Sequence, residues 1–100
     1  MNDLTIKETT VLTILYNAKN SDSYLFGKEI ALTKQYKKLY IKQKVRNHSY
    51  VCSCILILRR LIQKNLISFI EDLSSYGASI RKYKINEIGI KEIERMMISE

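Results

Sequence analysis

The chain has 100 residues, a formal net charge of +7, and 46% hydrophobic residues against 27% charged ones. This composition excludes intrinsic disorder, and the length predicts a single domain over residues 1–100. The longest uninterrupted apolar run, residues 54–58, is far shorter than the ~20 residues of a membrane span. Because the first ten residues lack the apolar core of a secretion signal, we expect a cytoplasmic protein.

The first 40 residues predict two helices. Thr5 and Glu8 have the spacing of a capping box, and apolar residues at helical spacing follow them, which predicts a first helix over residues 5–18. A second helix is predicted from about Tyr24 into the thirties, with an uncertain end because Tyr36, Leu39 and Tyr40 extend its apolar stripe. We expect this second helix to bury Phe26, Ile30 and Ala31.

A third helix is predicted after a polar, basic connection over residues 42–48. It begins near Ser49, ends near Lys64, and is followed by Asn65 at the position where a helix needs a left-handed terminating residue. One face of this helix carries the expected core residues Val51, Cys54, Leu58, Leu61 and Ile62.

The last third of the chain predicts a β-hairpin and a final helix. Residues 66–71 and 80–85 alternate as strands do, and the Ser- and Gly-containing residues 73–79 predict the loop between them. Asn86 is placed to cap a last helix with a narrow apolar stripe of Ile90, Ile93 and Met97. The fold class is therefore α+β, mostly α, in the order helix, helix, helix, strand, strand, helix.

Positive charge is concentrated in the middle of the chain. Residues 30–70 contain nine Lys or Arg residues and no Asp or Glu, and a second basic cluster follows at Arg81, Lys82 and Lys84. An AT-rich genome explains abundant Lys, but it does not explain the absence of acids over 41 consecutive residues. The pattern favours an anion-binding face, and nucleic acid is the expected partner.

Three stretches resemble the winged helix-turn-helix regulators of the PadR-like and MarR-like type. Residues 58–67, LRRLIQKNLI, are similar to the L-x-x-L-x-x-x-G-L-I pattern that ends the recognition helix, with Asn65 in place of Gly. Residues 24–30, YLFGKEI, resemble Y-G-Y-E-I, and residues 80–89, IRKYKINEIG, resemble R-x-Y-x-L-T-x-x-G. The chain departs from the pattern in its longer, more basic residues 33–48 and in having Ile55-Leu56 where Tyr-Pro often stands.

The resemblance implies sequence-dependent binding of double-stranded DNA by a homodimeric transcriptional regulator, with the third helix in the major groove. In this arrangement Ile57 points outward, where it could contact a thymine methyl group. For Tyr50 the alternative to a DNA contact is packing on Tyr36 or Tyr40. The residues expected to contact DNA are Lys42, Lys44, Arg46, His48, Ser49, Tyr50, Ser53, Arg60, Arg81 and Lys82.

The last helix is the predicted dimerisation element. Ile90, Ile93 and Met97 of this helix, with the additional Ile98, exceed what one small core requires. The alternative is that these residues simply cover the single core. Ile14 and Tyr16 of the first helix lie off its buried stripe and are expected to complete the interface.

The sequence predicts no enzyme activity, metal or cofactor. One His and two Cys make a poor zinc site, and no acid–base pair, nucleophile arrangement or phosphate loop is present. We expect Cys54 in the core and Cys52 at the surface, with a redox role for Cys52 left open. No small-molecule effector is evident, because so short a chain leaves little room for an effector pocket.

Two alternative functions stay open at the sequence level. A winged-helix domain also serves as a protein–protein interaction module, although such a module does not need a basic tract without acids. A replication-accessory protein of a plasmid or virus would bind DNA without regulating transcription, and the sequence does not distinguish it from a regulator.

Overall fold

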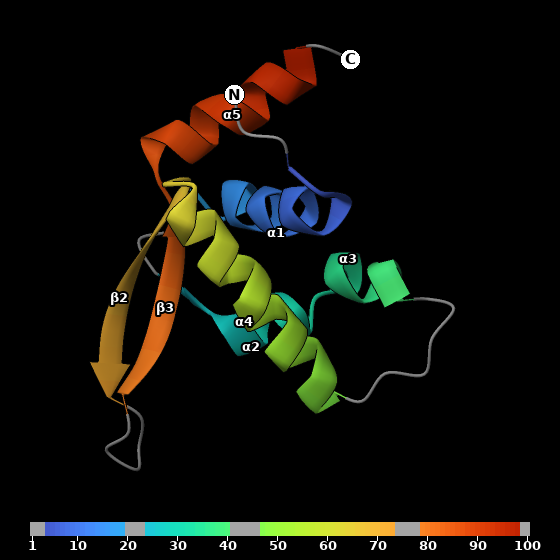
Figure 1. Cartoon of the computed structure of the whole chain (residues 1–100), viewed down its shortest axis with the longest axis vertical. Helices are drawn as coiled ribbons and strands as arrows, with labels where there is room; N and C mark the ends of the chain where they lie inside the picture. The colour runs from blue at the N-terminus through green and yellow to red at the C-terminus, as the bar shows by residue number, and fades with distance from the viewer. Residues whose placement is uncertain (1–3, 20–23, 41–46, 74–78, 99–100) are drawn as a thin grey trace.

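The computed structural model describes residues 4–19, 24–40, 47–73 and 79–98, which form one helical body with a projecting hairpin (Figure 1). The elements follow in the order α1 (Ile6–Asn17), β1 (Leu25–Phe26), α2 (Gly27–Ala31), α3 (Lys34–Lys37), η1 (Lys38–Tyr40), α4 (Asn47–Gln63), β2 (Ile67–Leu73), β3 (Ser79–Ile85) and α5 (Glu87–Ile98). None of the helices in the described ranges is long and apolar enough to cross a membrane.

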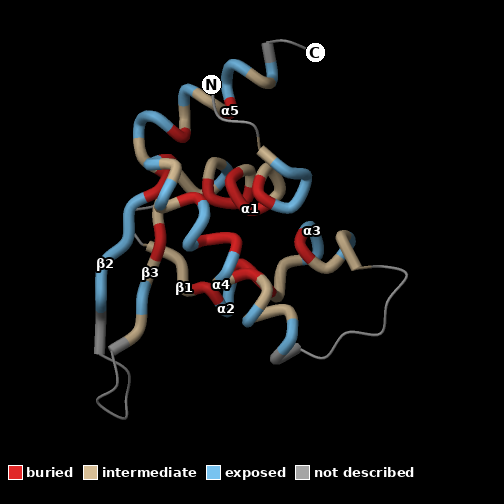
Figure 2. Tube along the Cα trace, in the orientation of Figure 1, coloured by how far each residue is buried: buried red, intermediate tan, exposed pale blue. Residues whose placement is uncertain are grey.

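Helix α1 begins with the predicted capping box. The Glu8 amide donates to Thr5 Oγ1 and the Thr5 amide donates to Glu8 Oε1, each over 3.1 Å. Two of the amides left unpaired at a helix start are thereby satisfied. The helix then buries Val11, Leu12 and Leu15 against α4, where they form one side of the core (Figure 2).

The second predicted helix is wrong in its extent. Leu25 and Phe26 form a strand, and the helix that follows ends at Ala31. A new helix, α3, begins after Thr33, whose extended backbone (ψ 153°) separates α3 from α2. The Thr33 hydroxyl caps α3 by accepting a hydrogen bond from the Tyr36 amide. Ile30 and Ala31 are buried as expected, whereas Phe26 is only half-buried.

The sheet has three strands in the order β1-β3-β2, all antiparallel, rather than the two expected. In it β3 pairs with β1 at Leu25↔Tyr83 and with β2 from Ile67↔Ile85 to Leu73↔Ser79. Tyr83 and Ile85 are buried in the core at the base of the hairpin. The far end of the hairpin projects beyond the helices (Figure 1).

Asn65 ends α4 in the predicted left-handed conformation, with φ 59°. Its amide donates to the Ile62 carbonyl over 2.9 Å and the Leu66 amide donates to the Leu61 carbonyl over 3.1 Å, which is the hydrogen-bond pattern of a Schellman motif. This termination turns the chain sharply from α4 into β2 and so fixes the hairpin relative to the helix.

Helix α5 packs across the turn between α4 and β2. Asn86 caps it as expected, because Asn86 Oδ1 accepts from the Gly89 amide over 2.8 Å. Gly89 itself lies against the Leu66 carbonyl oxygen, which would be only 2.2 Å from an added Cβ. A residue without a side chain is therefore needed at this contact.

Candidate nucleic-acid interface

Helix α4 presents one face to solvent along its whole described length. Cys54, Leu58 and Leu61 face the core and are fully buried, as the sequence predicted. The opposite, outward face consists of Ser49, Cys52, Leu56, Arg59, Arg60 and Gln63, all of which are exposed.

Sequence reasoning misassigned two residues on α4. Ile57 was expected outward, but only 3% of it is exposed, and its neighbour Leu56 is 55% exposed instead. Ser53 was also expected outward, but its hydroxyl faces α3 and η1, where it accepts from the Tyr36 hydroxyl over 2.8 Å. The core contacts of Ile57 and the tyrosine hydroxyl beside Ser53 fix the helix at a slightly different rotation from the one that hydrophobicity alone suggested.

Three tyrosine rings and Ser53 join α3 and η1 to the N-terminal half of α4. The Tyr40 hydroxyl lies 2.5 Å from Ser53 Oγ and 3.3 Å from the Tyr36 hydroxyl. Tyr50 packs edge-on against both rings, with centroids 6.4 Å from Tyr36 and 5.5 Å from Tyr40. Tyr50 therefore packs on Tyr36 and Tyr40, which was the alternative to its expected DNA contact.

The hydroxyl groups of Tyr36 and Tyr40 have pKa values shifted in opposite directions. Burial raises the pKa of Tyr36 above its ordinary value. Burial also opposes ionisation of Tyr40, but hydrogen bonds from Ser53 and Tyr36 and the nearby Lys7 ammonium outweigh it and lower the pKa of Tyr40. Lys7 also lies 4.8 Å from the centre of the Tyr40 ring, so the cluster extends to α1.

The hairpin places its cations against aromatic rings. The exposed Arg81 guanidinium lies 4.4 Å from the centre of the Phe69 ring, and its Nε is 3.9 Å from the Glu71 carboxylate. The Lys82 ammonium lies 4.6 Å from the centre of the Phe26 ring on β1. These contacts orient the two cations at the surface, where Arg81 is exposed and Lys82 is half-buried.

A groove of about 670 Å³ lies between α2, α4 and β3. Its apolar lining includes Val51, Ile55 and Tyr83. Three cations also line it: Lys28 from α2, Arg59 from α4 and Arg81 from β3. The groove's one acid, Glu29, accepts a hydrogen bond from the Phe26 amide over 3.0 Å.

Lys28 and Arg59 are functional candidates that the sequence reasoning did not place at the site. Neither forms an ion pair with any residue in the described ranges. The helical periodicity of α4, which places Arg59 on the outward face, is the sequence signal that could have identified it. No sequence pattern placed Lys28 beside the groove, because its position depends on how β1 and α2 fold.

Several predicted contact residues lie beyond what the structure describes. Lys42, Lys44 and Arg46 fall outside the described residues, and His48 belongs to α4 but its side chain is not among those described. Ser49 and Arg60 are exposed on the outward face of α4, and Arg81 and Lys82 lie on β3.

Solved structures with a similar fold are transcriptional regulators. The A103V mutant of MepR from a multidrug-resistant S. aureus clinical isolate has a TM-score of 0.66 and 22% identity, over 97% of this chain and 57% of that one. The chain thus spans little more than half of MepR. A PadR-family regulator from Clostridium difficile R20291 has a TM-score of 0.62 and 22% identity, over 95% and 86% of the two chains.

A PadR-like transcription factor from Bacteroides fragilis is also similar, with a TM-score of 0.62 and 17% identity, over 92% of this chain and 77% of that one. No family model and no curated protein matches the sequence. The chain has the winged-helix fold of the PadR and MepR regulators. The expected recognition helix corresponds to α4 and the expected wing to the β2–β3 hairpin, and the groove described above lies between them.

The last helix of this winged-helix domain differs from the expected dimerisation element. Ile93 is 2% exposed and belongs to the chain's own core, and Ile90 packs partly against that core. Met97, one turn further along the same face, is 50% exposed. In Figure 1 the C-terminal part of α5 angles away from α1. Ile14, expected outside the buried stripe of α1, is also in the core with 6% exposure.

The two cysteines lie where the sequence placed them, with Cys52 exposed and Cys54 buried. Burial raises the pKa of Cys54 to about 12. Among the described residues no group of three His, Cys, Asp or Glu side chains is arranged to hold a metal ion.

Proposed function

We propose that this chain is a transcriptional regulator that binds duplex DNA through the outward face of α4 and the β2–β3 wing. The observation that carries the proposal is the convergence of Lys28, Arg59 and Arg81, from three separate elements, beside an exposed recognition helix. Phosphate contacts of this kind position a protein on the duplex, while groups on the helix select the bases.

In this arrangement α4 enters the major groove. Ser49 and Arg60 offer a hydroxyl and a guanidinium to base edges or phosphates, and Arg81 and Lys82 reach the adjacent backbone or minor groove. Lys42, Lys44 and Arg46, which precede α4 in the sequence, and His48 remain proposed as further DNA contacts.

We further propose that two copies bind together. A two-fold dimer presents two recognition helices one helical turn of DNA apart. Two exposed apolar side chains support a contact through α1 and α5: Ile6 is 79% and Met97 50% exposed. Sedimentation of the full chain tests the dimer, and a monomer at micromolar concentration would contradict it.

Selection of bound fragments from random duplex DNA tests the function. Enrichment of a palindromic sequence supports a dimeric regulator. If six to eight phosphates are neutralised, log K should fall against log salt with a slope of roughly −5 to −7, and a flat response would refute the phosphate contacts. Genomic matches to the selected sequence near promoters, rather than near replication origins, would separate a regulator from a replication-accessory protein.

A protein-interaction module is the second candidate function. The apolar lining of the groove favours it, because Val51, Ile55 and Tyr83 suit an apolar side chain better than a phosphate. This candidate predicts no enrichment of any duplex in the selection experiment.

A further inference from the structure

The centre of the recognition helix is apolar. Leu56 is 55% exposed on the outward face of α4, and Cys52, one turn before it, is also exposed. Ser49 and Gln63 are the polar residues towards the two ends of this face, and Arg59 and Arg60 follow Leu56 directly. The hydrophobic core does not use Leu56, because Ile57 and Leu58 beside it are already buried there.

An apolar side chain at this position restricts which base edges it can favourably meet. The major-groove edges of guanine, cytosine and adenine present polar groups, which lose hydration without compensation when they face a leucine. Thymine alone presents a methyl group there. Contact between that methyl group and a leucine side chain removes apolar surface of both partners from water.

We propose that Leu56 is a specificity-determining residue that contacts the C5-methyl group of thymine. This inference rests on the proposed function, since it requires α4 to enter the major groove. Arg59 and Arg60 flank Leu56 with positive charge, so the helix approaches the duplex electrostatically while its centre selects A·T pairs by apolar contact.

The experiment compares duplexes of about 20 base pairs, two helical turns, with alternating A·T pairs that contain either thymine or uracil. Uracil lacks only the methyl group. For the wild-type chain we expect about fourfold weaker binding to the uracil duplex if one methyl contact is lost, and about tenfold or more if a two-fold dimer loses two. Leu56→Ala should bind the two duplexes about equally.

A matched control separates this contact from a general effect of uracil. Ile88 is 48% exposed and belongs to α5 rather than to the outward face of α4, so Ile88→Ala removes a comparable exposed side chain and should keep the wild-type ratio between the duplexes. Circular dichroism of both variants checks that they fold, as expected for exposed positions.

Two results would overturn the inference while leaving the proposed function intact. The first is equal affinity of the wild-type chain for the thymine and uracil duplexes. The second is a ratio that Leu56→Ala does not change. Absence of binding to any duplex, including those of mixed sequence, would overturn the proposed function and this inference together.

Discussion

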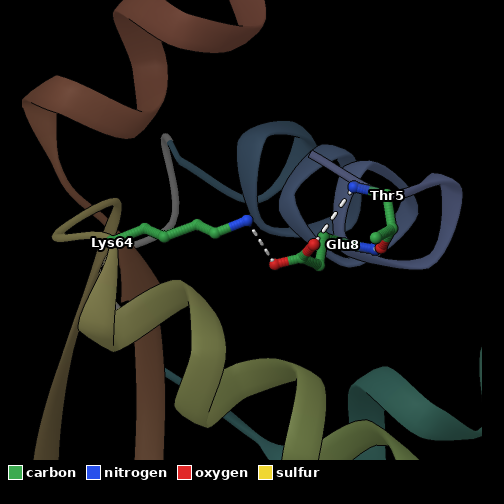
Figure 3. Close-up of polar contacts among 3 residues, drawn as sticks. All are labelled: Thr5, Glu8 and Lys64. Carbon is green, nitrogen blue, oxygen red and sulfur yellow. Dashed lines mark hydrogen bonds and ion pairs between the residues drawn. The ribbon is translucent and has the colours of Figure 1, made fainter. Parts of the chain in front are cut away.

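Lys64 Nζ lies 2.9 Å from Glu8 Oε2, joining the C-terminal end of α4 to the first turn of α1 (Figure 3). Glu8 is 2% exposed and Lys64 28% exposed, so the ion pair is shielded on one side only. Burial alone would raise the pKa of Glu8, but Lys64 and the hydrogen bonds with Thr5 outweigh it and hold this pKa below its ordinary value of 4.5. The carboxylate is therefore charged at neutral pH.

Replacing Glu8 should destabilise the fold in a pH-dependent way. We expect Glu8→Gln to lower the free energy of unfolding by about 1–3 kcal/mol at pH 7. Because the folded pKa lies below the unfolded one, the contribution is complete above the unfolded pKa and is lost as pH falls through the folded pKa. The difference between variant and wild type in urea unfolding should shrink below about pH 4.5.

Glu94→Gln is the matched control, since Glu94 is exposed on α5. Its free energy of unfolding should stay within about 0.5 kcal/mol of wild type at both pH values. An equal loss in the two variants would show that the Glu8–Lys64 pair does not stabilise the fold.

Gly89 should not tolerate a side chain. An added Cβ would lie 2.2 Å from the Leu66 carbonyl oxygen and 2.7 Å from Ile85 Cγ1. We expect Gly89→Ala to lower the free energy of unfolding by about 3 kcal/mol, because backbone must move to admit the methyl group. Thermal melts of the variant measure this loss. At Gly27 the atom nearest to an added Cβ would be 3.5 Å away, so Gly27→Ala should leave stability almost unchanged in the same measurement.

Asn65 should respond in opposite directions to two substitutions. Asn65→Gly should keep or raise the free energy of unfolding, because glycine adopts the φ of 59° without steric cost. Asn65→Ala should lower it by about 1 kcal/mol, since a Cβ disfavours the left-handed conformation. Chemical denaturation of both variants checks this, and a more stable alanine variant would contradict the Schellman termination of α4.

The two thiols should react at very different rates. A disulfide reagent such as DTNB should modify one thiol per folded chain at pH 8, because Cys52 is exposed whereas Cys54 is buried and has a pKa of about 12. Urea should make both react. In the folded Cys52→Ser variant we expect almost no reaction, and rapid modification there would mean that Cys54 is accessible.

Removing the Arg59 charge should weaken DNA binding mainly through phosphate contact. Arg59→Gln is expected to reduce the magnitude of the salt slope by about one and to weaken binding similarly for all sequences. Lys91→Gln removes an equal charge from the exposed surface of α5 and should leave both quantities near wild type. Fluorescence anisotropy between 50 and about 300 mM salt measures both variants, and identical slopes would remove Arg59 from the interface.

Local signals predicted much of this fold. The Thr5 capping box, the left-handed Asn65 and the Asn86 cap each depend on a few adjacent residues, so their chemistry is visible in the sequence. The order of the main helices and the hairpin followed from these caps and from hydrophobic periodicity. The predicted recognition helix and wing follow from that order.

Relationships between distant residues were not predictable in this way. Strand β1 has only two residues, too few to show any alternation, and it exists because Leu25 and Phe26 pair with β3. The Glu8–Lys64 pair joins two helices whose relative placement only the folded core determines. The rotation of α4, which exposes Leu56 and buries Ile57, likewise depends on contacts with other elements.

The tyrosine cluster gives the protein an intrinsic spectroscopic reporter. The chain contains no tryptophan, and three of its seven tyrosines meet where η1 and α3 touch the first turns of α4. The near-ultraviolet circular dichroism of the protein should therefore include a large contribution from the coupled Tyr36, Tyr40 and Tyr50 rings, beside that of the buried Tyr83. A change in how α4 packs against α3 and η1 should therefore be visible in unlabelled protein.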